Sequence, residues 1–441
     1  MVGQLGDIAL SSVGMAGQWA WLMNMFLFGT VSGGAIFISQ YWGIQDIKGV
    51  RRIFGLMLLF AGIFCALFFV SGSFLSELVI SVFNRTPVIV EQGSAYLRIV
   101  VFSYPAVGLS AVLSAVLRAT EKVRLPMYIS LVTTVLNAFL NFSLIFGKFG
   151  LPQMGTEGAA VATCISSWSG PVLLIIVSLA QKNILYAPLK EIFCFSRADL
   201  REFLIRALPI MANEALWGMG TLVYNVIFAN LGYEQYAAMT IFRTFEGVSF
   251  VFAIGLCNAC CIMVGKKIGV GDFKDAIDDA KRFIVLMIAF SVIVGGAILI
   301  FKTPLVGIFN FGANILPTTL SVAEGIMMTY AIFLPISMMP YLLIVGIFRS
   351  GGDSTTGMKY DISTQWFLAI PFTAIAAFLI RAPFLNVVFV MYFSDTVLKT
   401  LFCFKHFLSY RWIQPVTDEG KEALESFDLI RQPKKPRVKK G

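Results

Sequence analysis

The residues best suited to chemistry in this sequence are a few polar side chains that interrupt its long apolar runs. Glu214 follows Pro209 by five residues, with Asn213 beside it and Trp217 about one helical turn further along. A carboxyl group in apolar surroundings can cycle between neutral and ionised forms, so Glu214 has the chemistry to bind a proton or a small cation reversibly. The alternative is a structural role, in which a protonated Glu214 hydrogen-bonds a neighbouring helix.

Two further pairs of charges lie at helical spacing in apolar segments. Arg243 and Glu246 are three residues apart, share one helix face and are predicted to form an internal ion pair. A second interpretation joins Glu246 to Glu214 in a cation site, with Arg243 changing partners as protons arrive. Asp395 and Lys399, four residues apart, are predicted to form a structural pair.

The other intramembrane polar positions are mostly neutral. Asn137 and Asn141 lie one helical turn apart, and Thr163 lies in the next apolar segment. Amides can coordinate ions but cannot release a proton. Asp361 shares a helix face with Gln365, and its place near the start of an apolar segment predicts that it serves the helix terminus.

The sequence predicts neither a metal site nor an enzyme centre. Cys257, Cys260 and Cys261 are close in sequence, but adjacent cysteines on a helix point apart and no histidine is near. The single histidine, His406, ends an apolar segment and is interpreted as interfacial. An intramembrane enzyme, the alternative from another class, would need a histidine-based, paired-aspartate or zinc centre. ATP hydrolysis is not expected, because the sequence has no GxxxxGK[ST] loop.

The composition indicates which kind of structural element carries these residues. The chain has 441 residues, of which 58% are hydrophobic and 13% charged, about half the charged content of soluble domains. The seven cysteines lie mostly in apolar runs and are interpreted as packing residues. These features predict an all-α polytopic membrane protein, and they exclude a secreted disulfide scaffold, a nucleic-acid reader and most cytosolic enzymes.

Eleven apolar segments are long enough to cross a bilayer of about 30 Å, which takes roughly 20 helical residues. They lie near 10–39, 53–75, 96–117, 126–146, 158–180, 200–230, 236–265, 283–301, 321–348, 358–379 and 384–404. Basic residues are retained on the cytoplasmic side of a membrane. The tail from Lys405 and every second loop hold 27 Lys and Arg, whereas the opposite side holds four. We therefore expect a cytoplasmic C-terminus, an inner-membrane location and an external Met1.

An internal repeat explains this odd number of crossings. At an offset of 226 residues, seven positions match: Leu5, Gly6, Phe26, Gly29, Ile36, Gly43 and Asp46 match Leu231, Gly232, Phe252, Gly255, Ile262, Gly269 and Asp272. At an offset of 231, three more match: Phe102, Arg118 and Met127 match Phe333, Arg349 and Met358. Met1 then aligns near the end of the segment at 200–230, so we expect the chain to lack the first of twelve helices. The alternative is chance similarity within an eleven-helix protein.

The repeat predicts two six-helix bundles related by a pseudo-twofold axis. The first lobe covers 1–181 with five helices present, a cytoplasmic linker covers 182–199, and the second lobe covers 200–410 with six helices. A basic cytoplasmic tail covers 411–441. Its final stretch from Arg431 holds six basic residues and no acidic one, which favours binding to anionic lipid over nucleic acid.

Several short motifs, in their order and spacing, resemble those of one family. They are LG at 5–6, SQYWG at 39–43, LRAT at 117–120, PMY at 126–128, GAAVAT at 158–163, LP at 208–209, NE at 213–214, WG at 217–218, VG at 264–265 and RSGGD at 349–353. Together they resemble the multidrug and toxic compound extrusion (MATE) family over essentially the whole chain. The resemblance implies two six-helix lobes and export of organic, often cationic, compounds in exchange for protons or sodium ions.

The resemblance also bears on the polar residues. It places Glu214 where the family carries an acidic residue, and it maps Asn137, Asn141 and Thr163 onto the polar cluster of the first lobe. The sequence departs from the family at Asn141, where some relatives carry an acid. It departs again in the segment 321–348, which offers only Glu324 as an acidic residue.

The sequence thus predicts a secondary antiporter that works by alternating access and needs no cofactor beyond H⁺ or Na⁺. The residues predicted to couple the cation are Glu214, Glu246, Asn213, Asn137, Asn141 and Thr163, with Arg243 as ion pair or switch. Those predicted to line the substrate cleft are Trp217, Tyr224 and Gln365. The expected partners are small organic cations and membrane lipids, and the expected state is a monomer. The alternatives are a lipid-linked or polyisoprenoid flippase of the same superfamily and a truncated, non-functional transporter.

Overall fold

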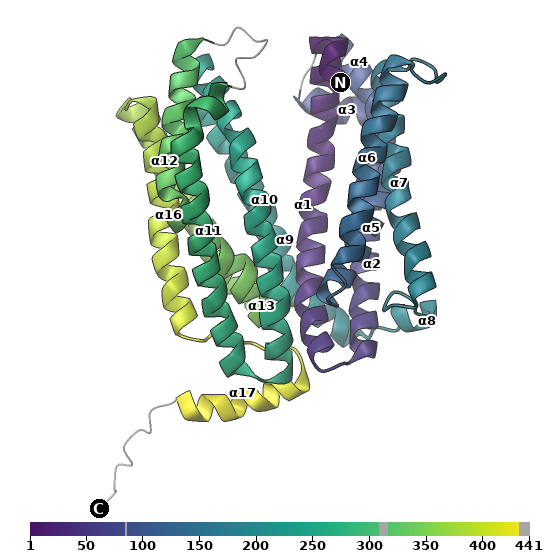
Figure 1. Cartoon of the computed structure of the whole chain (residues 1–441), viewed down its shortest axis with the longest axis vertical. Helices are drawn as coiled ribbons and strands as arrows, with labels where there is room; N and C mark the ends of the chain where they lie inside the picture. The colour runs from purple at the N-terminus through teal and green to yellow at the C-terminus, as the bar shows by residue number, and fades with distance from the viewer. Residues whose placement is uncertain (84–85, 308–315, 432–441) are drawn as a thin grey trace, which may run out of the picture. The chain divides into compact units, whose positions relative to one another are not determined.

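The computed structural model describes residues 1–83, 86–307 and 316–431 (Figure 1). Within these residues the chain is helical, without a β-strand and with one isolated β-bridge between Gly352 and Ile413. Ten of the described helices are long and apolar enough to cross a membrane. The predicted class, an all-α polytopic membrane protein, is therefore confirmed.

All eleven predicted segments fall on helices, but one of them differs from the other ten. The segment at 200–230 forms α9 (Arg197–Ala229), which is not among the ten membrane-spanning candidates. Asn213, Glu214 and Asn225 interrupt its apolar residues and lower its mean hydropathy. This helix carries Glu214, one of the two carboxylates predicted to couple the cation.

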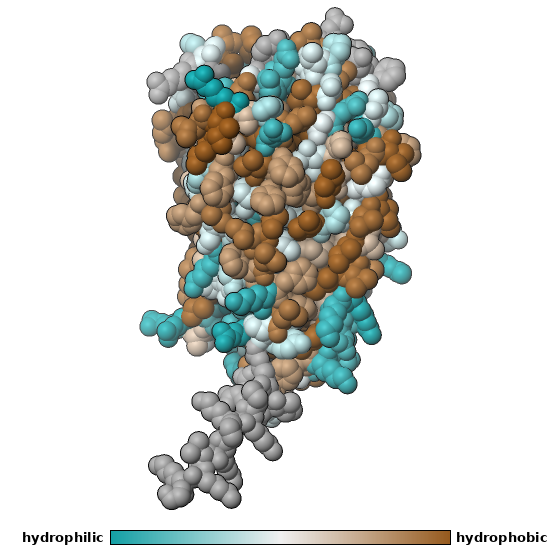
Figure 2. Space-filling view, turned by 90° about the vertical axis from the view of Figure 1, so that its left-hand side faces the viewer, coloured by the Kyte–Doolittle hydropathy of each residue, from teal (hydrophilic) through white to brown (hydrophobic). Residues whose placement is uncertain are grey.

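The outer surface agrees with a membrane environment. Figure 2, which faces the side of α12 and α16, shows apolar side chains over the middle of the molecule and polar side chains gathered towards its ends. On α11 alone, Val285, Ile293 and Ile300 are each at least 65% exposed. Large apolar side chains exposed in such numbers are stable only against lipid or a partner.

The chain divides into two compact units. Unit 1 comprises Met1–Ile38 and Asp46–Glu214, and unit 2 comprises Ser39–Gln45 and Ala215–Gly441. The division falls within α9, directly after Glu214, whereas the sequence placed the boundary in a linker at 182–199.

Unit 1 holds the helices of the first half. They are η1 (Val2–Leu5), most of α1 (Asp7–Gly43), α2 (Ile47–Phe74), α3 (Ser76–Phe83), α4 (Pro87–Val100), η2 (Val101–Ser103), α5 (Tyr104–Ala119), α6 (Arg124–Phe146), α7 (Gly155–Gln181), α8 (Leu189–Ile192) and the first half of α9. The short helix α8 lies within the predicted linker. It docks on α2, because Glu191 forms an ion pair with Arg51.

Unit 2 holds the helices of the second half. They are the rest of α9, α10 (Tyr233–Val270), α11 (Phe273–Gly307), α12 (Pro317–Tyr341), η4 (Leu342–Phe348), α13 (Arg349–Gly351), α14 (Ser354–Thr364), η5 (Gln365–Ala369), α15 (Ile370–Ala374), η6 (Ile375–Leu379), α16 (Phe384–Leu408) and α17 (Asp418–Arg431). Three of these segments, η4, η5 and η6, are π-helical turns that continue the α-helices before them. Such turns often mark functional sites, and η5 begins at Gln365.

The residues that repeat at an offset of 226 have structural roles in both halves. Asp46 caps α2 by accepting a hydrogen bond from Gly49 N at 2.9 Å, and Asp272 accepts one from Asp275 N at 3.2 Å. Such caps satisfy backbone donors at a helix start. In unit 2, a side chain at Gly43 would meet the Lys266 carbonyl, and its repeat partner Gly269 packs equally closely on the backbone of Gln40.

The predicted C-terminal tail is partly folded into unit 2. Trp412 is fully buried, its indole N–H donates to the Phe407 carbonyl at 3.1 Å, and Gln414 N donates to the Gly351 carbonyl at 2.7 Å. Phe427 of α17 packs edge-on against Phe273. The proposed lipid-binding stretch beyond Arg431 lies outside the described residues.

Candidate functional site

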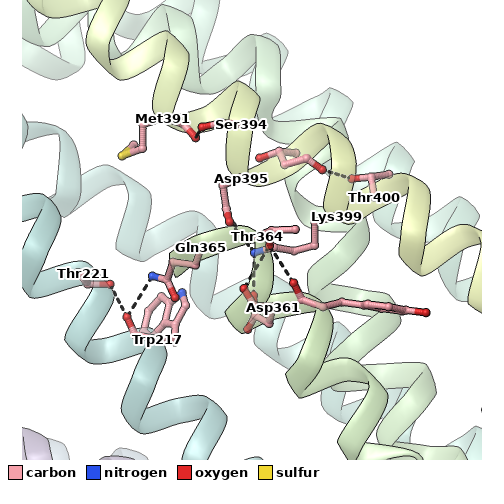
Figure 3. Close-up of polar contacts among 12 residues, drawn as sticks. Trp217, Thr221, Asp361, Thr364, Gln365, Met391, Ser394, Asp395, Lys399 and Thr400 are labelled. Atoms are coloured by element: carbon pink, nitrogen blue, oxygen red, sulfur yellow. Dashed lines mark hydrogen bonds and ion pairs between the residues drawn. The ribbon is translucent and has the colours of Figure 1, made fainter. Parts of the chain in front are cut away.

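Three charged side chains meet between α14 and α16 in unit 2. Lys399 Nζ lies 2.7 Å from Asp361 Oδ1 and 2.8 Å from Asp395 Oδ1, and Figure 3 shows the ammonium between the two carboxylates. The side chains of Lys399, Asp361 and Asp395 are 8%, 17% and 32% exposed. The predicted Asp395–Lys399 pair is confirmed, but the prediction for Asp361 is wrong, because this residue lies two turns inside α14 and binds Lys399.

The start of α14 explains how these charges come into register. Asp353 is the residue that caps α14, and it accepts a hydrogen bond from Thr356 N at 3.1 Å. Its Oδ2 also lies 2.8 Å from His406 Nε2 on α16. The helices α14 and α16 run in opposite directions. Asp361 lies about two turns after Asp353 on α14, and Lys399 lies about two turns before His406 on α16. The contact between Asp353 and His406 therefore places Asp361 next to Lys399.

The predicted cleft residues Trp217 and Gln365 are neighbours in unit 2. The Gln365 amide donates to the Trp217 carbonyl at 3.3 Å, and the Thr221 hydroxyl donates to the same carbonyl at 3.1 Å (Figure 3). Trp217 is 36% exposed, but Gln365 is only 4% exposed. Gln365 therefore joins η5 to α9, and its role in a substrate cleft stays a prediction.

Tyr224, the third predicted cleft residue, lies two turns after Trp217 on α9. It is 8% exposed, and its hydroxyl has no hydrogen-bond partner among the described residues. The ring of Phe228 stacks against that of Tyr224 with centroids 6.3 Å apart.

Glu246 finds a partner that the sequence did not predict. The Tyr392 hydroxyl on α16 donates to Glu246 Oε1 at 3.2 Å. Arg243 acts on Glu246 electrostatically, yet within the described residues no ion pair of 4.0 Å or less joins the two. The predicted Arg243–Glu246 ion pair is therefore not what the structure shows. Glu246 instead accepts a hydrogen bond from the neutral hydroxyl of Tyr392, which lies 146 residues further along the chain.

The predicted grouping of Glu246 with Glu214 spans the two units. Glu214 is half-buried and Asn213 is 4% exposed on the part of α9 that belongs to unit 1, whereas Glu246 belongs to unit 2. A joint cation site of Glu214 and Glu246 stays a prediction.

The first-half polar residues form a hydrogen-bonded chain between α6 and α7. Asn141 Nδ2 donates to Asn137 Oδ1 at 2.9 Å, and Asn137 Nδ2 donates to the Ser166 hydroxyl at 2.9 Å. Thr163 lies one turn before Ser166 and donates to the Ala159 carbonyl at 2.9 Å. The structure thus brings the two asparagines together and adds Ser166, while the Thr163 hydroxyl binds its own helix.

The described residues offer no metal centre of three or more His, Cys, Asp or Glu side chains. Cys257, Cys260 and Cys261 are buried on α10, as packing residues would be. The polar groups named above in unit 2 are carboxylates, the Lys399 ammonium, the Arg243 guanidinium and phenol hydroxyls.

Comparisons with known sequences point to one family. The sequence profile of the MatE family matches residues 1–143 and 209–375, and that of the lipid II flippase MurJ matches residues 86–233. The probable multidrug resistance protein NorM of Thermotoga maritima is 26% identical over 405 residues, which cover 92% of this chain and 85% of NorM. The uncharacterized transporter YisQ of Bacillus subtilis is 20% identical over 94% of this chain and 90% of YisQ.

Solved structures agree on the fold. A variant of the Vibrio cholerae MATE transporter VcmN superposes on this chain with a TM-score of 0.80 at 18% identity, over 98% of this chain and 92% of VcmN. The NorM and VcmN similarities run through both units described above. Because the MatE profile matches well over half of its residues, this chain belongs to the MATE family of multidrug efflux transporters.

Proposed function

We propose that this chain is a secondary antiporter that exports organic cations in exchange for protons or sodium ions. The observation that carries the proposal is the Glu246 carboxyl group, which lies fourteen residues into the 38-residue helix α10 and accepts the Tyr392 hydroxyl. A carboxylate at such a depth is costly unless a proton, an ion or a ligand neutralises it. A phenol both donates and accepts hydrogen bonds, so Tyr392 can hold Glu246 in either protonation state.

Glu214 is the second proposed coupling residue. It follows Pro209, which lies inside α9 and has no backbone N–H for the helical ladder. The helix can therefore bend next to the carboxyl group. A coupling ion and a cationic cargo compete for the same negative charge, and this competition would link entry of one to export of the other.

The proposed location is the bacterial cytoplasmic membrane, with the C-terminus on the cytoplasmic side. The excess of Lys and Arg in every second loop of the sequence supports this orientation. The proposed state is a monomer, and no cofactor is required.

The test is dye efflux from membrane vesicles with imposed gradients. Vesicles that contain the parent chain, Glu214→Gln or Glu246→Gln are loaded with ethidium and given either a proton or a sodium gradient. We expect each Gln variant to lose at least about tenfold in the gradient-driven rate, because a Gln cannot carry the charge. Glu234→Gln, at the first turn of the same helix α10, is the matched control and should keep the parent rate.

Two outcomes bear directly on the proposal. Equal rates for the parent and both Gln variants under either gradient would refute the assignment of the coupling residues. Efflux by the parent that is unchanged when both gradients are collapsed would refute antiport itself.

A flippase for lipid-linked substrates is the second candidate, because the MurJ profile matches residues 86–233. It predicts that reconstituted chain moves a fluorescent lipid-linked headgroup across the bilayer, as followed by quenching with an impermeant reagent. Ethidium efflux without lipid movement would favour the antiporter.

A further inference from the structure

The helices α3 and α4 border a cavity of about 800 Å³ at the end of unit 1 that also holds the N-terminus (Figure 1). The cavity has both a charged and an apolar lining. Glu77, Glu91 and Arg98 supply the charges, and Leu78 and Ala95 are among the apolar side chains. A ligand for this cavity must therefore carry charged groups next to an apolar part.

The length of α2 places this cavity at the level where lipid headgroups begin. After Arg52, α2 carries no charged residue up to its end at Phe74. These 74 − 52 = 22 residues rise about 33 Å at 1.5 Å per residue, close to the roughly 30 Å of a hydrocarbon core. Helix α3 begins at Ser76, and its Leu78 and Val82 share one helix face and are 60% and 76% exposed. Such an amphipathic helix suits the boundary between acyl chains and headgroups.

Arg98 is fixed in the cavity with part of its guanidinium available. Its Nε donates to the Ser76 hydroxyl at 2.8 Å, and its Nη2 donates to Glu77 Oε1 at 2.8 Å. Its Nη1 has no partner among the described residues, and the side chain is 55% exposed. The planar guanidinium is well suited to phosphate oxygens. Arg98 can therefore bind a phosphate group while it keeps its contacts with α3.

Glu91 supplies a negative charge further from the membrane. It lines the same cavity and forms no ion pair within the part of the chain that the structure describes. It precedes Arg98 by seven residues on α4, which puts both on one helix face and about 10 Å apart along the axis. In a phospholipid the phosphate lies next to the glycerol, and a headgroup ammonium lies further from the acyl chains. Arg98 and Glu91 match such a headgroup in charge and in order.

We propose that the cavity between α3 and α4 binds the headgroup of a zwitterionic phospholipid with a primary ammonium, as in phosphatidylethanolamine. Arg98 Nη1 donates to the phosphate, and Glu91 accepts hydrogen bonds from the ammonium. Leu78 contacts the part of the lipid next to the acyl chains. The inference goes beyond cation export and requires only that the chain lies in a bilayer.

The test is native mass spectrometry of the delipidated full chain in detergent, titrated with three phospholipids of equal acyl chains. We expect phosphatidylethanolamine to bind more tightly than phosphatidylcholine, whose ammonium has no N–H, and than phosphatidylglycerol, which has no ammonium. Glu91→Gln should weaken phosphatidylethanolamine binding about three- to fivefold, as for other exposed charge pairs, and should remove its advantage over phosphatidylcholine. Arg98→Gln should weaken both lipids alike. Glu324→Gln, the same change on α12 of unit 2, is the control and should bind as the parent does.

Three outcomes would overturn the proposal. They are equal binding of phosphatidylglycerol and phosphatidylethanolamine by the parent, parent-like selectivity in Glu91→Gln, and equally tight binding of glycerophosphoethanolamine. The last compound has the headgroup without acyl chains, so its tight binding would identify a soluble phosphate ester as the ligand. If Arg98→Gln does not fold, the loss of selectivity in Glu91→Gln decides.

Discussion

Replacing Lys399 by Met would test how the charges of unit 2 contribute to stability. Lys399 is 8% exposed and lies 2.7 and 2.8 Å from its two carboxylate partners. Without its ammonium, Asp361 and Asp395 repel each other in apolar surroundings. The protein must then tolerate this repulsion or take up a proton.

The size of the effect follows from the geometry. Two unit charges at about 4 Å interact by about 4 kcal/mol at an effective dielectric constant of 20. The desolvation of the lysine offsets much of this attraction, so the measured cost of breaking a buried pair is about 3–5 kcal/mol. Because Asp395 is 32% exposed and can be hydrated, we expect Lys399→Met to lower the free energy of unfolding by about 3 kcal/mol, the lower end of that range.

The free energy of unfolding can be measured by SDS titration in mixed micelles. The matched control is a neutral triple variant, Lys399→Met with Asp361→Asn and Asp395→Asn, which should lie within about 1 kcal/mol of the parent. The reasoning is refuted if the single variant is as stable as the parent. It is also refuted if the triple variant is as unstable as the single one, because the loss would then come from packing and not from charge.

Three further predictions concern stability in the same assay. Trp412→Ala should lower the free energy of unfolding by about 3–5 kcal/mol, because Trp412 is fully buried. A loss below about 1 kcal/mol would mean that the C-terminal segment is not part of the core. Asp353→Ala should lower the free energy of unfolding by about 2 kcal/mol, because it removes the cap of α14 and the contact with His406. Asp353→Asn can still cap the helix and should lower it by less. Equal losses in the two variants would contradict the role of Asp353 as a cap. Asn137→Ala should cost about 1–2 kcal/mol for its hydrogen bonds to Asn141 and Ser166, and no change would show that they contribute nothing.

Contacts within one helix were predictable from the sequence. Asp395 and Lys399 are four residues apart, and the helical repeat alone places such residues on one face. The same rule placed Asn137 next to Asn141. It failed for Arg243 and Glu246, because a shared face permits an ion pair but does not exclude a better-placed partner such as Tyr392.

Contacts between helices were not predictable. Asp361 lies 38 residues from Lys399, and Glu246 lies 146 residues from Tyr392. Whether such residues meet depends on how each helix is rotated and shifted along its axis. In unit 2, the contact between Asp353 and His406 and the hydrogen bond between Gln365 and Trp217 help to fix these positions.

The sequence by itself determined the helical membrane class, the positions of the apolar segments and the repeat, because a bilayer needs about 20 apolar residues per crossing and a duplicated chain keeps its spacing. The tertiary structure alone decided that Lys399 lies between two carboxylates and that Glu246 accepts a hydrogen bond from Tyr392. The physical reason is that the hydropathy of a segment depends only on its own residues. The partner of a buried charge depends on how several helices pack against one another.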